Sequence, residues 1–135
     1  MSKPILVDTD ILVDFLRGGK EAVEFIRIHS QEIILSSIVV AELYAGVKGA
    51  QEETTLDDFI SLFRVVPVTA EIAKTGGLTK RDFGKSHGLG LADAIMAATA
   101  QAENADLRTL NIRHFPCFGT CILHIKRNRR PISMT

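Results

Sequence analysis

The fold is decided near the start of the chain, where residues 4–16 read PILVDTDILVDFL. Pro4 through Val7 is a short apolar run that ends at Asp8, and this pattern predicts a buried strand. Thr9 or Asp10 can then cap a helix that fills the rest of the segment. A short strand followed at once by a helix is typical of the units that build a parallel sheet.

The same alternation continues along the chain. Short β-branched runs predict further strands, and apolar residues at helical spacing predict the helices between them. The expected strands are 33–35, 65–68, 105–110 and 121–125, and the expected helices are 21–29, 36–47, 56–63, 69–78 and 91–102. We therefore predict an α/β fold, with a parallel sheet of about five strands that is flanked by helices on both faces.

Length and charge indicate one ordinary globular domain with a basic end. The chain has 135 residues, of which 46% are hydrophobic and 24% charged. Its 16 basic and 16 acidic residues balance, which argues against binding nucleic acid by bulk charge alone. Four of the basic residues lie in the last ten positions. We expect a domain over residues 1–125 and a basic tail over residues 126–135.

Nothing in the sequence predicts a membrane or secreted protein. The longest mostly apolar stretch, Ile33 to Val47, is short for a bilayer span and contains Glu42. No basic start with an apolar core indicates a signal peptide. Two cysteines do not make a disulfide scaffold, so we expect a cytoplasmic protein.

Three acids stand out because each lies near the carboxyl end of a predicted strand or in a helix that follows one. Asp8 ends an apolar run, Glu42 lies among apolar neighbours, and Asp93 begins an otherwise uncharged helix. Taken singly, helix capping, a solvated face and the helix dipole would explain them. Taken together, they would meet at the carboxyl edge of the sheet, where their repulsion means that either some of them are protonated or a cation lies among them. Oxygen ligands favour Mg²⁺ or Mn²⁺ over zinc, and the predicted chemistry is phosphodiester hydrolysis.

Four sequence blocks resemble the motifs of PIN-domain proteins, in the order and compact length of VapC-type toxins. The blocks are ILVDTDILVDFLRG (5–18), SSIVVAELYAGV (36–47), LADAIMAATA (91–100) and TLNIRHF (109–115). The resemblance implies a Mg²⁺- or Mn²⁺-dependent ribonuclease that forms a homodimer. It further implies that a small cognate antitoxin protein silences the enzyme.

The resemblance also assigns roles to residues. It implies that Asp8 and Asp93 hold the metal, while Glu42 binds it or orients the attacking water. The fourth block has Asn111 where family members often carry an acid, with His114 nearby, and this departure makes a second metal ion doubtful. Thr109 is expected to support Asp8 through its hydroxyl group.

Other interpretations remain open from sequence alone. Asp8 and Asp10 resemble the paired aspartates of haloacid-dehalogenase-like phosphatases, in which Asp10 would be the general acid. A PIN-like module that binds RNA without cleaving it is a further alternative. Cys117 and Cys121 form part of a pattern with His114 and His124, which packing explains more readily than structural zinc.

Overall fold

The computed structural model of the chain describes residues 3–110 and 122–123. A parallel sheet of five strands forms its centre, in the order β3-β2-β1-β4-β5. The strands are β1 (Ile5–Val7), β2 (Ile33–Ser36), β3 (Arg64–Val66), β4 (Asp106–Arg108) and β5 (Ile122–Leu123). The helices are α1 (Thr9–Leu16), α2 (Lys20–His29), α3 (Ser37–Ala45), α4 (Ala50–Ile60), α5 (Ala70–His87) and α6 (Leu91–Glu103). The predicted α/β class and parallel sheet are confirmed.

The strand order creates a switch point beside β1. The chain moves from β1 through β2 to β3 in one direction and then returns to place β4 on the other side of β1. In register, Ile5 lies opposite Ile33 of β2 and Asp106 of β4. In open α/β sheets, ligands bind outside the carboxyl ends of the strands at such a point.

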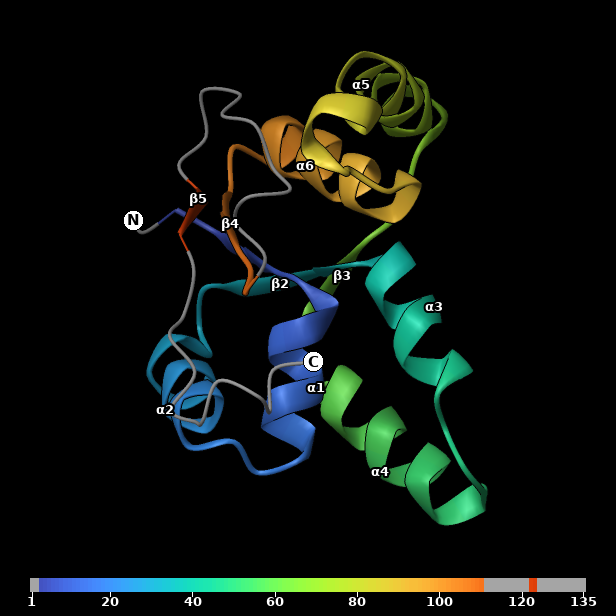
Figure 1. Cartoon of the computed structure of the whole chain (residues 1–135). Coiled ribbons are helices and arrows are strands. Elements are labelled where there is room, and N and C mark those ends of the chain that lie inside the picture. Colours follow the sequence, from blue (N-terminus) through green and yellow to red (C-terminus); the bar gives the residue numbers. More distant parts are fainter. Residues whose placement is uncertain (1–2, 111–121, 124–135) are drawn as a thin grey trace.

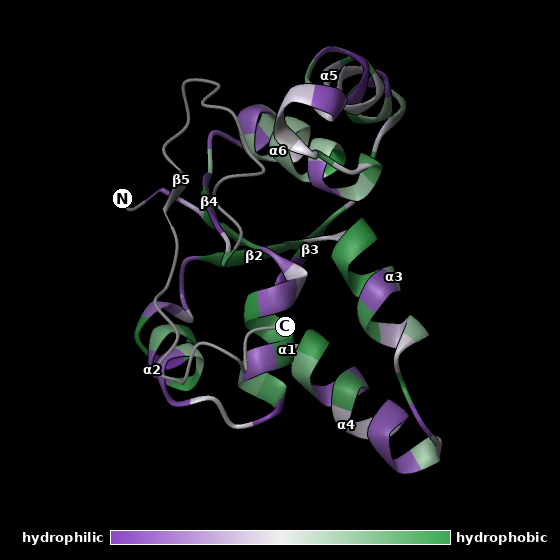
Figure 2. Ribbon diagram, viewed as in Figure 1, coloured by the Kyte–Doolittle hydropathy of each residue, from purple (hydrophilic) through white to green (hydrophobic). Residues whose placement is uncertain are grey.

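Helices cover both faces of the sheet. Figure 1 shows α1 and α2 on one side and α5 and α6 on the other, with α3 and α4 beside α1. The core is built from strand residues and the helix sides that face them, including Leu6, Leu12, Leu35 and Leu107. Figure 2 shows this pattern: the central strands are hydrophobic, while the outer half of α4 is mostly hydrophilic.

Helices α5 and α6 pack closely where one glycine meets a neighbouring helix. A Cβ atom on Gly76 would lie 2.9 Å from Cγ1 and 3.0 Å from Cα of Ile95. Because Ile95 follows Asp93 by two residues, this contact fixes the helix that carries a candidate site residue. Gly77, by contrast, faces open space.

Several expected details differ from the structure. The N-cap of α1 is Asp8, not Thr9 or Asp10, because the Asp8 carboxylate accepts a hydrogen bond from the Thr9 backbone. The helix expected over 56–63 begins earlier and ends at Ile60, so Phe63 lies beyond it. Within the described residues, no helix is long and apolar enough to cross a membrane.

Candidate active site

Asp8 occupies the centre of the site because β1 ends immediately before it. The side chain is only 8% exposed, and both of its oxygens accept hydrogen bonds. Oδ1 accepts from the backbone N–H of Thr9 at 2.8 Å. Oδ2 accepts from the hydroxyl of Thr109 at 2.7 Å. One carboxylate thus caps α1 and contacts the segment that follows β4.

Asp10 attaches the same helix to the end of β4 by a second route. Its Oδ2 accepts a hydrogen bond from the backbone N–H of Leu110 at 3.1 Å and lies 3.3 Å from the Thr109 hydroxyl. Asp8 and Asp10 therefore share Thr109 as a neighbour. This arrangement orients residues 109–110, which lead directly to Asn111.

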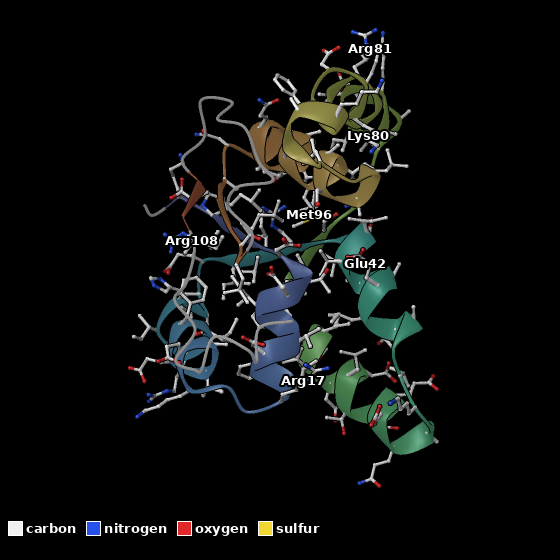
Figure 3. The ribbon with its side chains drawn as sticks, viewed as in Figure 1. Arg17, Glu42, Lys80, Arg81, Met96 and Arg108 are labelled. Carbon is white, nitrogen blue, oxygen red and sulfur yellow. The ribbon has the colours of Figure 1, made fainter. Side chains whose placement is uncertain are left out.

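Glu42 reaches the site from α3 and meets the residue between the two aspartates. The Thr9 hydroxyl donates a 2.5 Å hydrogen bond to Oε1 of Glu42, although the Glu42 side chain is otherwise exposed. Figure 3 shows Glu42 on α3 next to the N-terminal end of α1. The structure thus brings Glu42 to the helix end that carries Asp8.

Asp93 lies half-buried in the first turn of α6, and its negative charge acts on the pKa of Asp8. Burial, and after it the negative charges of Asp10 and Asp93, raise the pKa of Asp8 from 3.8 to about 7. The hydrogen bonds from Thr109 and Thr9 act in the opposite direction and lower the pKa. Excess negative charge at a desolvated carboxylate is the environment that a cation would relieve.

Helix ends explain why acids can gather at this edge. Helices α1 and α3 start directly after β1 and β2, and α6 precedes β4, so all three begin on the carboxyl side of the sheet. The N-terminal end of a helix carries partial positive charge and unpaired N–H groups, which favour nearby carboxylates. Asp8 caps one of these helices, and Asp93 lies in the first turn of another.

The structure places three of the four predicted catalytic residues at one edge, and the fourth lies outside its description. Asn111, His114, Cys117, Cys121 and the basic tail over 126–135 all fall outside the described residues. In the described part of the chain, no three acidic, histidine or cysteine side chains already lie together as a ligand set. Asp8 and Asp93 interact through their charges, whereas Glu42 is held through Thr9.

The side-chain oxygens at this edge are of the kind that bind a divalent cation. Asp8, Asp93 and Glu42 offer carboxylate oxygens, the ligands that Mg²⁺ and Mn²⁺ accept. Burial and the charges of Asp10 and Asp93 raise the pKa of Asp8, so a bound cation would favour its ionised form. We therefore regard the edge as suited to a divalent metal, with Asp8 and Asp93 as the residues that would hold it.

Sequence reasoning missed the contacts of Thr9 and Asp10. It treated both as helix caps, whereas their side chains bind Glu42 and Leu110. These contacts join residues 33 and 100 positions apart, so no local pattern could reveal them. The position of Thr9 and Asp10 directly after a strand-ending aspartate was the available signal.

Comparison with known proteins identifies the family that has this fold and this acidic edge. Residues 5–115 match the family model described as the PIN domain, which spans the sheet up to β4 and all six helices. The chain belongs to the PIN domain family, and within it to the group of VapC ribonucleases, as its relatives show.

Two relatives from Mycobacterium tuberculosis place the chain in this group. Ribonuclease VapC19 is 42% identical over 118 residues, covering 84% of this chain and 93% of the relative. Ribonuclease VapC10 is 37% identical over 117 residues, covering 84% and 87%. A solved complex, VapBC2 from Rickettsia felis bound to a promoter DNA fragment, contains a similar fold. Its TM-score is 0.75 at 26% identity, with 90% of this chain and 98% of that chain covered.

Proposed function

We propose that this chain is an endoribonuclease that requires a divalent metal, and that it is the toxin of a toxin–antitoxin pair. The observation that carries this proposal is the arrangement of Asp8, Asp93 and Glu42 at the carboxyl edge of a PIN-domain sheet. The ribonuclease names of VapC19 and VapC10 support the activity. The solved toxin–antitoxin complex from Klebsiella pneumoniae, with a TM-score of 0.74, supports the toxin role.

Each acid has a distinct task in the proposed hydrolysis. Asp8 and Asp93 would hold the metal, and Glu42 would bind it or orient the water that attacks the phosphorus atom. A divalent cation held by these residues would supply neutralisation of a phosphate oxygen and a lower pKa for the attacking water. Thr109 keeps the Asp8 carboxylate in one orientation by donating to Oδ2. The N-terminal ends of α1 and α6 contribute positive potential toward the RNA phosphate.

We propose Mg²⁺ or Mn²⁺ as the metal and one ion for each chain. Carboxylates without histidine or cysteine ligands support this class of ion. Asn111 replaces an acid in the fourth motif, so the site has one negative charge fewer than its fullest version. That reduced charge supports a single ion, which the amide oxygen of Asn111 can still assist.

Neither alternative interpretation is favoured. A phosphatase would require Asp10 as a general acid. In the structure, however, Oδ2 of Asp10 accepts hydrogen bonds from the Thr109 hydroxyl and from the Leu110 backbone N–H. An inactive RNA-binding module would not need to keep Asp8, Glu42 and Asp93 in place. The relatives named ribonucleases point in the same direction.

The proposed partners are RNA, a small cognate antitoxin and a second copy of this chain, in the cytoplasm. A groove of about 740 Å³ lies between α1, α2, α4 and the β2–β3 edge of the sheet. It is lined by apolar side chains that include Phe15, Ile26, Phe59, Leu62 and Phe63. We propose that an apolar segment of the antitoxin occupies it, since the similar solved proteins are complexes with their antitoxins.

Residues 1–125 form the proposed nuclease domain and 126–135 its basic tail.

RNA cleavage tests the proposed activity. Purified wild-type protein, Asp93→Asn and Asp58→Asn are incubated with a mixed RNA in Mn²⁺ and, separately, in EDTA. Asp58 is an exposed acid on α4, away from the site, and serves as the matched control. We expect cleavage by wild type and Asp58→Asn in Mn²⁺ alone, and none by Asp93→Asn. Equal cleavage by Asp93→Asn would contradict the proposal.

A further inference from the structure

We infer that Thr9 is a positioning residue that holds Glu42 in its working orientation, a role that rests on the proposed function. The inference starts from one contact. The hydroxyl of Thr9 donates to Oε1 of Glu42 at 2.5 Å, which is the short end of the range for a hydroxyl bonded to a carboxylate. The contact joins α1 to α3 across 33 residues of sequence.

Thr9 is itself fixed by its place at the start of α1. Its backbone N–H donates to Oδ1 of Asp8 at 2.8 Å, so the residue is tied to the central carboxylate. A β-branched side chain in a helix has few χ1 choices. The direction of the Thr9 hydroxyl is therefore set by the same helix end that orients Asp8.

Glu42 needs such support because its side chain is long and exposed. A free glutamate on a helix surface samples many rotamers, and fixing it costs conformational entropy. Among the described residues, Thr9 is the hydrogen-bond partner of Glu42. The contact engages Oε1, and within the described part of the chain no hydrogen bond to Oε2 is found, so this oxygen can meet a water molecule or an ion. Thr9 thereby sets the position of Glu42 relative to Asp8 through two consecutive hydrogen bonds.

A purely architectural role would have different consequences. If the hydroxyl only joined α1 to α3, its loss would lower stability and leave the metal site of the folded protein unchanged. If it positions Glu42, its loss weakens metal binding and slows the chemical step in protein that is fully folded. Groups that orient metal-binding side chains typically contribute 10- to 100-fold to affinity or activity.

The test compares Thr9→Val, which removes the hydroxyl but keeps the branched shape, with Thr9→Ser, which keeps it. Thr54→Val is the matched control, because the Thr54 hydroxyl donates to the Ala50 carbonyl of its own helix. Calorimetric titration with Mn²⁺ alone measures affinity, and single-turnover RNA cleavage measures the chemical step. We expect Thr9→Val to weaken Mn²⁺ binding and to slow cleavage, each by about tenfold. Thr9→Ser and Thr54→Val should keep Mn²⁺ affinity and a cleavage rate near those of wild type.

A double-mutant cycle with Glu42→Gln identifies the residue through which Thr9 acts. Adding Thr9→Val to Glu42→Gln should cause little further loss, because the positioned carboxylate is already gone. Full additivity, or a Thr9→Val protein with wild-type affinity and rate, would overturn the inference. Loss in Thr9→Ser equal to that in Thr9→Val would also overturn it. A wild-type protein that binds no Mn²⁺ would instead contradict the proposed function, and with it this inference.

Discussion

The hydroxyl of Thr109 donates a 2.7 Å hydrogen bond to Oδ2 of Asp8, across 101 residues of sequence. Both side chains are buried, and each follows a central strand of the sheet. The backbone repeats the connection, since the Asp8 N–H donates to the carbonyl of Arg108 at 3.0 Å. The ends of β1 and β4 thus meet at one carboxylate, which belongs both to the fold and to the proposed active site.

Removing that hydroxyl should destabilise the protein. In Thr109→Val, a buried carboxylate loses a donor, and we expect the free energy of unfolding at pH 8 to fall by about 1–3 kcal/mol. Thr99→Val is the control: Thr99 is equally buried, but its hydroxyl bonds the Ile95 carbonyl of its own helix. Urea denaturation measures the loss in the free energy of unfolding for both variants. Equal losses in the two variants would show that the Asp8 contact contributes nothing particular.

The charge on Asp8 should lower the stability of the metal-free protein as pH rises. Burial and the nearby acids raise its pKa from 3.8 to about 7, so the folded state favours the protonated form. The contribution of protonated Asp8 to the free energy of unfolding is present in full below pH 3.8 and is lost as the pH passes about 7. With about 1.4 kcal/mol for each pH unit between the two values, the upper bound of the loss is about 4 kcal/mol.

The measurement compares urea unfolding of wild type and Asp8→Asn in EDTA between pH 4 and 8. Asparagine also caps helices well, so the variant keeps the start of α1 while removing the charge. We expect wild type to lose stability relative to Asp8→Asn as the pH increases. A difference that stays constant across this range would contradict the assigned cause.

The sequence predicted most of the fold because the relevant patterns are local. Apolar runs such as Pro4–Val7 and the helical spacing around Leu56 depend on neighbours a few residues away. The placement of Asp8 and Asp93 at one edge follows from parallel topology. The contacts of Thr9 and Asp10 could not be predicted, because they depend on where α3 and the end of β4 lie in space.

Two adjacent glycines in α5 should respond oppositely to alanine. A Cβ on Gly76 would press against Ile95 of α6, and crowding of this kind costs about 1–3 kcal/mol. A Cβ on Gly77 meets no atom within 4 Å, so Gly77→Ala should gain about 0.5–1 kcal/mol from helix propensity. Thermal unfolding of the two variants checks this. Stabilisation by Gly76→Ala would contradict the close approach of α5 and α6.

Tyr44 offers a direct probe of the α3–α4 contact. It is the only tyrosine, the chain has no tryptophan, and its hydroxyl donates to Oδ1 of Asp57 on α4. This hydrogen bond raises the pKa of Tyr44 from 10.0 to about 12. Absorbance titration should therefore show delayed ionisation in wild type, with circular dichroism confirming that the protein stays folded.

Asp57→Ala is the matched variant for that titration. It removes the acceptor and its charge, so the Tyr44 pKa should return toward 10.0. Identical titration curves for the two folded proteins would show that α3 and α4 are not joined through this pair.

Calorimetric titration of metal-free protein with Mn²⁺ tests whether Asp8 and Asp93 bind the same ion. Wild type, Asp8→Asn and Asp93→Asn are compared, with Asp58→Asn as the control for loss of an acid elsewhere. We expect one ion for each wild-type or Asp58→Asn chain and affinity at least about tenfold weaker in either site variant. Wild-type affinity in Asp8→Asn or Asp93→Asn, or no binding by wild type, would contradict it.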